Sequence, residues 1–365
     1  MSSSPQAHKP GEGKRSGRSL IRIVGLIALL ILVLAAVFVW PLARAVTMVN
    51  SQTPNNDPAS IYLSSEDDFE SLVEKLIEGE LIKREKDFRR IAEIMDYGPS
   101  VRPGHYLIKP GLTSRELITP LRIGQEDPVM VSFGKYRTLP ELASVVATQL
   151  ALDSVEIMNA YHDPVIQEEL GISSDHLLGL AIPNTYEMWW SSSARGFLER
   201  MAKERERFWD SDNRRQKAEA LNLSIEEVEV IASIVEEEQN RYSDEWPAIA
   251  GVYLNRVRRG MRLEADPTVK FALGRWDIRR VLNQHKESSS DSPYNTYYAN
   301  GLPPGPICSP AGKARDAVLN AQDHNYIFMC AKADFSGYHA FAANLSQHNR
   351  NARLYQRALD QRGIR

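Results

Sequence analysis

Residues 224–240, SIEEVEVIASIVEEEQN, form the stretch on which the fold and function of this chain depend. Ser224 followed three residues later by Glu227 is a capping box, in which each side chain accepts a hydrogen bond from the backbone N–H of the other residue. Apolar residues then recur at the three- and four-residue spacing of an amphipathic helix. The pattern predicts a helix from Ser224 to about Asn240 that packs one stripe against a hydrophobic core.

The acidic cluster at the end of this helix has one member that faces the apolar stripe. At about 100° per residue, Glu238 lies roughly 20° from Ile231, in the middle of the stripe, whereas Glu236 and Glu237 point elsewhere. A carboxyl group on a core-facing stripe loses hydration, which raises its pKa and makes it a proton donor near neutral pH. We therefore expect Glu238 to be a general acid, and Glu237 to lie at the surface.

Composition indicates an ordinary globular chain. Its 365 residues are 43% hydrophobic and 25% charged, which suits one large domain or two moderate ones. The formal net charge of −3 gives no support for nucleic acid as a partner. Two cysteines, Cys308 and Cys330, make no disulfide framework, and we expect buried thiols instead of a bridge. The histidines lack metal-ligand spacing, so we expect no metal and no cofactor.

One segment is apolar enough to cross a membrane. Residues 23–43, IVGLIALLILVLAAVFVWPLA, contain no charged side chain and exceed the usual core of a signal peptide, about 7 to 15 residues. The expected transmembrane helix spans residues 20–43. Basic residues dominate its upstream flank, which places the N-terminus in the cytoplasm. Residues 1–19 are then a disordered cytoplasmic tail, and residues 44–60 a polar linker on the other side.

The remainder of the chain is predicted to be α+β. Residues 61–125 alternate short strands with amphipathic helices in a compact unit, and residues 126–362 form a larger mixed α+β domain. Within it, segment 177–190, LLGLAIPNTYEMWW, is either a wall on which sugars stack or a buried corner of the core. The proline-rich segment 291–312 is expected to be a rigid loop at a cleft. A C-terminal helix from Asn349 onward carries arginines, most simply a solvated face.

Four ordered motifs carry a family resemblance. They are IASIVEEEQ (231–239), GVYLNRV with MRLEADPTVKFALG (251–274), SPYNTYYANGLPPGPI (292–307) and GYHAFAANLSQHN (337–349). Behind a single membrane anchor, this set resembles the catalytic domain of endolytic murein transglycosylases, the MltG or YceG-like family. Residues 61–125 resemble the LysM-like subdomain of that family.

What the resemblance implies is a membrane-anchored lyase on the periplasmic side of the bacterial inner membrane. Its substrate would be nascent peptidoglycan strands, in which it cuts the β-1,4 bond between N-acetylmuramic acid and N-acetylglucosamine. Glu238 matches the catalytic glutamate of the family and would protonate the glycosidic oxygen. The carboxylate would then take a proton from the C6 hydroxyl, which closes a 1,6-anhydro ring without consuming water. This setting suggests peptidoglycan synthases as partners.

The resemblance also implies a set of site residues around Glu238. Glu236 is expected to support the site, and Asp266 to orient the substrate or form a turn. Asn295, Thr296 and Tyr297 offer amide and hydroxyl groups that bind the sugar or pin their own loop. The other motif residues expected to bind substrate or support the site are Asn255, Thr268, His339, Asn344, His348 and Asn349.

Two further functions stay open from the sequence. If Asp266 were a second catalytic carboxylate, the enzyme would be a muramidase, a hydrolase whose products have reducing ends. Alternatively, the chain would be a non-catalytic scaffold that binds the cell wall through residues 61–125. The chemical identity of the product ends distinguishes the lyase from the muramidase. The presence of turnover distinguishes both enzymes from the scaffold.

Overall fold

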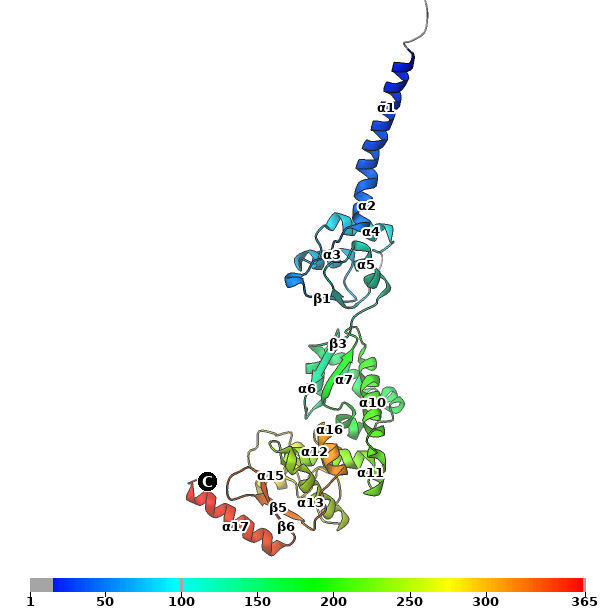
Figure 1. Cartoon of the computed structure of the whole chain (residues 1–365). Coiled ribbons are helices and arrows are strands. Elements are labelled where there is room, and N and C mark those ends of the chain that lie inside the picture. Colours follow the sequence, from blue (N-terminus) through cyan, green and yellow to red (C-terminus); the bar gives the residue numbers. More distant parts are fainter. Residues whose placement is uncertain (1–15, 99–100, 364–365) are drawn as a thin grey trace, which may run out of the picture. The chain divides into compact units, whose positions relative to one another are not determined.

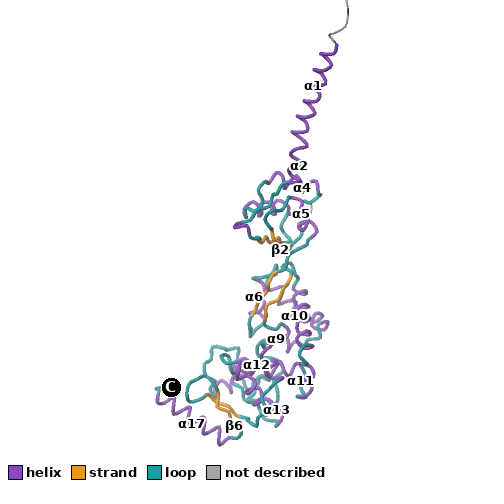
Figure 2. The backbone as a smooth tube through the Cα atoms, in the orientation of Figure 1, coloured by secondary structure: helices purple, strands orange, loops and turns teal. Residues whose placement is uncertain are grey.

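In the computed structural model of the chain, residues 16–98 and 101–363 are described, and they form two compact units (Figure 1). The first unit covers Met1–Asp127 and the second covers Pro128–Arg365. Helices dominate both, and the described strands pair into three small antiparallel sheets (Figure 2). The predicted fold class, α+β behind a single N-terminal apolar helix, is confirmed.

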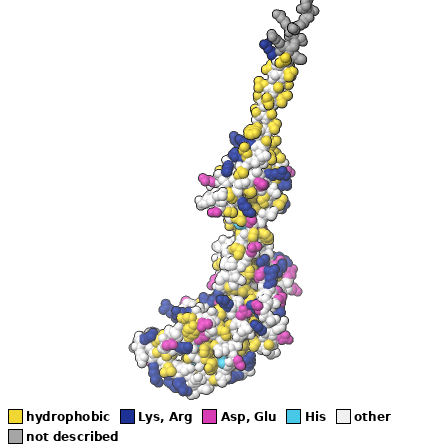
Figure 3. Space-filling view, viewed as in Figure 1, with side chains coloured by type: hydrophobic (Ala, Val, Ile, Leu, Met, Phe, Trp, Pro, Cys, Tyr) yellow, Lys and Arg dark blue, Asp and Glu magenta, His cyan; other side chains and the backbone are white. Residues whose placement is uncertain are grey.

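The N-terminal helix is longer than the predicted one. It comprises α1 (Ser16–Leu34), the π-helical turn η1 (Ala35–Val39) and α2 (Trp40–Thr47). Its segment Ile21–Thr47 is the one stretch among the described residues that is long and apolar enough to cross a membrane. Figure 3 shows its exposed apolar side chains. Residues 16–19, expected in the tail, form its first turn, since no proline blocks a helical backbone there. Residues 1–15 lie outside the described part.

A small sheet and three helices build the rest of the first unit. Its elements are η2 (Pro54–Asn56), β1 (Ala59–Leu63), α3 (Phe69–Glu78), α4 (Glu85–Ile94), β2 (Gly104–Ile108) and α5 (Ser114–Ile123). The two strands are antiparallel, with Ile61 opposite Tyr106. Alternating residues of the sheet and one face of each helix enclose a core that includes Leu72, Phe88 and Leu117.

Residues 44–60 are not the free polar linker that the sequence suggested. Arg44 pairs with Asp87 of α4 at 3.0 Å. Asn50 is fully buried, and its amide donates to the Ser114 hydroxyl at 2.8 Å. Polar composition was misleading because a polar side chain can be buried when its hydrogen bonds are made inside the protein. The apolar helix therefore runs directly into the first unit.

The first half of the second unit packs helices on the sheet of β3 and β4. Its elements are β3 (Val129–Phe133), α6 (Leu139–Ala147), α7 (Ser154–His162), α8 (Pro164–Glu169), η3 (Ser174–His176), α9 (Leu177–Leu180), β4 (Asn184–Met188) and α10 (Ala194–Asp210). Segment 177–190 supplies β4. Its Tyr186 and Met188 are buried in the core, whereas Trp189 is 53% exposed. The buried corner is thus the better interpretation for most of this segment.

The second half of this unit surrounds helix α12. Its elements are α11 (Arg214–Ala220), α12 (Ile225–Glu238), η4 (Ser243–Glu245), α13 (Trp246–Arg258), α14 (Asp266–Ala272), α15 (Asn283–Ser288), α16 (Gly312–Leu319), β5 (Phe328–Ala331), β6 (His339–Ala342) and α17 (Leu345–Gln361). The predicted capping box of Ser224 and Glu227 opens α12. Helix α17 starts at Leu345, before the expected Asn349, because Asn344 caps it through the Gln347 N–H.

Helix α12 is buried on nearly all sides. It packs against α13 and α16, and every residue from Val228 to Glu237 is buried. Such burial requires internal partners for each charged side chain. Glu229, which has no exposed surface, meets Arg205 and Arg315 at 3.1 Å each. Arg315 is equally buried and also donates to the Gly179 carbonyl at 2.9 Å.

We expect Glu229→Gln to lower the free energy of unfolding of the second unit by about 3–5 kcal/mol, because two arginines would be left buried without a full counter-charge. Chemical denaturation of the full chain in detergent measures this loss. Glu226→Gln is the matched control, since Glu226 pairs with the same Arg205 at 3.4 Å but keeps 44% of its side chain exposed. Its expected cost is below about 1 kcal/mol. Equal costs for the two variants would contradict this account.

Candidate active site

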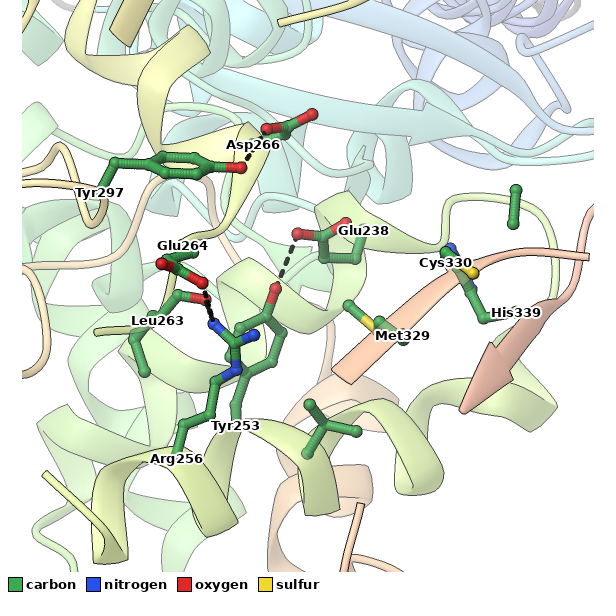
Figure 4. Close-up of a pocket in the computed structure, with 12 residues that line it drawn as sticks. Glu238, Tyr253, Arg256, Leu263, Glu264, Asp266, Tyr297, Met329, Cys330 and His339 are labelled. Atoms are coloured by element: carbon green, nitrogen blue, oxygen red, sulfur yellow. Dashed lines mark hydrogen bonds and ion pairs between the residues drawn. The ribbon is translucent and has the colours of Figure 1, made fainter. Parts of the chain in front are cut away.

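A cavity of about 220 Å³ lies at the C-terminal end of α12 (Figure 4). Its polar wall comes from four elements and one loop, and it contains Glu238, Tyr253, Asp266, Tyr297 and His339. The other lining residues are Val252, Arg256, Leu263, Glu264, Met329, Cys330 and Ala331. Four predicted site residues, Glu238, Asp266, Tyr297 and His339, therefore meet at one cavity although they are far apart in the chain.

Glu238 is the last residue of α12, and its carboxyl group faces the cavity. The Tyr253 hydroxyl of α13 donates a hydrogen bond to Glu238 Oε1 at 2.7 Å. Burial raises the pKa of Glu238 to about 7; the Tyr253 hydrogen bond opposes the rise, and the charge of Asp266 adds to it. The negative end of the helix dipole acts in the same direction as burial. Glu238 can therefore hold and release a proton near neutral pH.

Asp266 is the second carboxylate of the cavity wall. It stands at the start of α14, and its Oδ1 accepts a 2.7 Å hydrogen bond from the Tyr297 hydroxyl. Burial and the charge of Asp266 raise the pKa of Tyr297, so this tyrosine remains a neutral donor. Glu238 and Asp266 are thus each fixed by one tyrosine hydroxyl, whereas Glu264, which also lines the cavity, pairs with Arg256. Figure 4 shows these pairs.

Three predicted site residues lie behind the wall instead of lining it. Thr268, Asn295 and Thr296 are fully buried. The two threonine hydroxyls bond each other at 2.9 Å, and Thr296 Oγ1 accepts from the Ala265 N–H. Asn295 donates to the Lys286 carbonyl at 2.8 Å. These residues hold the loop that carries Tyr297 against the segment that carries Asp266, which corresponds to the loop-pinning alternative.

The other two glutamates of the cluster do not line the cavity. Glu236 is buried and accepts a 2.8 Å hydrogen bond from the Ala311 N–H, and burial raises its pKa. Glu237, expected at the surface, is buried as well, and that prediction was wrong. It pairs with Lys135 at 2.8 Å and with Arg137 at 2.9 Å. The helical periodicity could not reveal these partners of Glu237, because both cations come from a loop about 100 residues earlier in the chain.

The remaining predicted residues are dispersed around β5 and β6. Asn255 holds a loop by donating to the His324 and Tyr326 carbonyls. His348 stacks on Phe328, and burial lowers its pKa. Asn344 caps α17 and Asn349 is exposed on that helix. None of these lines the cavity. Asn255 and Asn344 hold backbone through hydrogen bonds, whereas His348 is held by ring stacking.

Tyr253 was missed as a site residue. Tyr253 lies on the buried face of α13, where an aromatic residue is most simply part of the core, and only the fold shows that its hydroxyl bonds to Glu238. Arg256, one turn further along α13, was missed too. Its guanidinium donates to the Leu263 carbonyl at 2.8 Å and to Glu264 at 3.0 Å, and so fixes the segment before Asp266.

The described residues contain no group of three or more His, Cys, Asp or Glu side chains that could hold a metal ion. Both cysteines are free thiols, and Cys308 is buried as expected. Cys330 is only partly buried and lines the cavity. The polar groups that line the described cavity are carboxyl, hydroxyl, imidazole and guanidinium groups together with the Cys330 thiol.

Comparisons with known proteins agree on one family. A family model described as "YceG-like family" matches residues 61–354. An endolytic murein transglycosylase from Bacillus subtilis is 36% identical over 133 residues, 36% of this chain and 35% of that protein. One from Streptococcus pneumoniae is 26% identical over 300 residues, 74% of this chain and 53% of that protein. The chain thus spans only a third to a half of these relatives.

A solved structure shows the same fold. The crystal structure of a yceG-like protein from Listeria monocytogenes superposes with a TM-score of 0.54 at 23% identity. The alignment covers 80% of this chain and 98% of that one. At this level of identity the likeness concerns the fold.

We expect Tyr253→Phe to raise the pKa of Glu238 from about 7 to a value roughly one pH unit higher. The reason is that this variant removes a hydrogen bond that stabilises the carboxylate. A ¹³C NMR titration of the glutamate carboxyl groups, with the Glu238 signal assigned by its absence in Glu238→Gln, measures the shift. Tyr297→Phe is the control, since it removes the matching bond to Asp266. An unchanged or lowered Glu238 pKa in Tyr253→Phe would refute this role.

Proposed function

The chain belongs to the YceG-like family, and from this premise we propose that it is a lytic transglycosylase acting on peptidoglycan. The substrate is the uncrosslinked glycan strand, and the bond cut is the β-1,4 bond between N-acetylmuramic acid and N-acetylglucosamine. The curated relatives named endolytic murein transglycosylase support the substrate class. The observation that carries the reaction is Glu238, a carboxyl group with a pKa of about 7 at the wall of a cavity.

In the first half of the reaction, protonated Glu238 gives its proton to the glycosidic oxygen. The C1–O4 bond breaks, and positive charge develops at C1 of the muramic sugar. The Tyr253 hydrogen bond to Oε1 keeps the carboxyl group oriented and stabilises the carboxylate that forms. A pKa near 7 suits this step, because the group is partly protonated at neutral pH and still acidic enough to donate.

In the second half, the Glu238 carboxylate takes the proton of the C6 hydroxyl on the same sugar. The C6 oxygen bonds to C1 and closes the 1,6-anhydro ring, so the proton lost to the leaving group is recovered. No water is consumed, and one carboxyl group serves both steps. Asp266 has a supporting part: its negative charge faces the cavity and favours both a protonated Glu238 and the cationic transition state.

A second candidate function is a hydrolase, and the presence of Asp266 in the same cavity as Glu238 favours it. In such an enzyme Asp266 would activate a water molecule or attack C1 directly. Its 2.7 Å bond to Tyr297 occupies one oxygen and leaves the other for chemistry. The reaction product distinguishes the two candidates, because a lyase forms an anhydro end where a hydrolase forms a reducing end.

The proposal extends to the setting of the enzyme. The apolar helix Ile21–Thr47 anchors the chain as a single membrane span with its N-terminus in the cytoplasm, which leaves the part of the first unit after Thr47 and the whole second unit outside. There the enzyme meets nascent strands and the peptidoglycan synthases, which we propose as partners. The first unit, with its LysM-like segment 61–125, adds contacts to the glycan, and residues 126–362 carry out the cleavage.

Incubation of the full chain in detergent with uncrosslinked glycan strands is expected to yield 1,6-anhydromuramic ends. Mass spectrometry detects them as products lighter than the hydrolytic ones by one water. Reducing ends as the dominant product would replace the lyase by the hydrolase. The Asp266→Asn variant is a useful companion, since a lyase should keep its anhydro product at reduced rate, whereas a hydrolase that uses Asp266 should stop.

Glu238→Gln is expected to lower turnover by at least about 10²-fold, because the amide cannot donate a proton to the leaving oxygen. Binding of glycan strands, measured by co-sedimentation, should be retained. Asp244→Asn serves as the control, since Asp244 lies six residues away on η4 and is exposed beside Tyr338. Undiminished turnover in Glu238→Gln would remove Glu238 from the chemistry, and absence of turnover in the unaltered chain would favour the scaffold.

A further inference from the structure

A third carboxylate, Glu245, lies directly behind His339 and has no part in the mechanism above. It ends the short helix η4, and 7% of its surface is exposed. Glu245 Oε1 accepts a 2.8 Å hydrogen bond from the backbone N–H of His339. Glu245 Oε2 lies 2.8 Å from His339 Nδ1 and accepts a 2.9 Å bond from the Gln239 amide. Three polar groups thus converge on one buried carboxylate.

The donors around Glu245 constrain the tautomer of His339. A backbone N–H and the Nε2 of Gln239 donate, one to each oxygen of Glu245, which is the arrangement that suits a carboxylate. With Glu245 as a carboxylate, the contact with Nδ1 is a bond only if that nitrogen carries a hydrogen. In the neutral imidazole the lone pair must then be on Nε2. The carboxylate selects this tautomer, as the aspartate does in a Ser-His-Asp triad.

In this tautomer, His339 Nε2 is a hydrogen-bond acceptor at the cavity. His339 lines the same cavity as Glu238, and no hydrogen bond among the described residues engages its Nε2. Gln239, the residue after Glu238, donates both to Glu245 and to the Gly337 carbonyl at 2.9 Å. The end of α12 and the start of β6 are therefore fixed by the same side chain. The imidazole is held in one orientation relative to the catalytic helix end.

We infer that Glu245 is a positioning residue, which holds His339 so that Nε2 accepts a hydrogen bond from a sugar hydroxyl of the bound glycan. This inference rests on the proposed function and adds a contact to the same site. A hydroxyl that enters a cavity loses its hydration, and an acceptor already in place compensates that loss. The buried negative charge of Glu245 makes the imidazole a stronger acceptor.

The decisive variant is Glu245→Gln, which keeps the size of the side chain. Its amide has one acceptor and one donor end, and the donor end needs an acceptor in place of a donor. Gln239 could supply one only by rotating its amide and giving up its bonds with Gly337, Arg241 and Tyr242, whereas His339 Nδ1 only has to lose its hydrogen. The imidazole proton is then expected to move to Nε2, which turns the acceptor in the cavity into a donor. We expect kcat/KM on uncrosslinked strands to fall roughly 10- to 100-fold, because the sugar hydroxyl loses its partner.

The test uses the full chain in detergent with ¹⁵N-labelled histidine. NMR correlation spectra give the tautomer of His339, whose signals are assigned by their loss in His339→Gln. The unaltered chain should show the Nδ1–H form, and Glu245→Gln the Nε2–H form. Asp244→Asn, a neighbouring carboxylate bonded to the exposed Tyr338 hydroxyl, should change neither the tautomer nor the rate. His339→Gln, whose amide oxygen can replace Nε2, should retain several-fold more turnover than His339→Leu.

The outcomes separate this inference from the proposed function. An Nε2–H form in the unaltered chain, or a tautomer switch that leaves kcat/KM unchanged, would overturn the inference while the lyase stands. If the unaltered chain has no turnover, the affinity for glycan strands replaces kcat/KM as the measured quantity. Strands should then bind the Glu238→Gln variant more tightly than the double variant Glu238→Gln with Glu245→Gln. Equal binding would then overturn the inference as well.

Discussion

The burial of helix α12 is the constraint on which the second unit depends. A helix buried on nearly all sides cannot leave a carboxylate without an internal partner, and α12 carries four along its buried length and at its end. Glu229 is matched by two arginines, Glu237 by a lysine and an arginine, and Glu236 by a backbone N–H. Of these four glutamates, Glu238 alone is bonded to a neutral hydroxyl and lines a cavity.

This difference in partners separates structural from chemical roles. Cations lower the pKa of Glu237, so its charge is permanent and its contribution is to stability. Burial with one hydroxyl raises the pKa of Glu238 to about 7, so its proton is exchangeable at neutral pH. The helix thus presents one reactive carboxyl group while the others are committed to ion pairs or backbone contacts. Glu245 is likewise a buried carboxylate with internal partners, and it fixes the imidazole of His339, which lines the cavity.

The sequence predicted what depends on local spacing and missed what depends on distant partners. The capping box of Ser224 and the helix that ends at Glu238 follow from local sequence, and the structure has them. The predicted single apolar stripe was too narrow, because α12 is buried on nearly all sides. The burial of Glu237, the hydroxyl of Tyr253 and the carboxylate behind His339 depend on contacts across many residues. The prediction of a free linker over residues 44–60 was wrong for a related reason, because polar composition does not reveal that Asn50 is hydrogen-bonded to Ser114.

In the proposed mechanism, the proton carried by Glu238 starts the reaction. The pH dependence of kcat/KM for the full chain on uncrosslinked glycan strands reports the ionisation of the essential groups of the free enzyme. We expect kcat/KM to decline as the pH rises through about 7, in step with the titration of Glu238 observed by ¹³C NMR. A rate that stays constant while Glu238 loses its proton would contradict this mechanism.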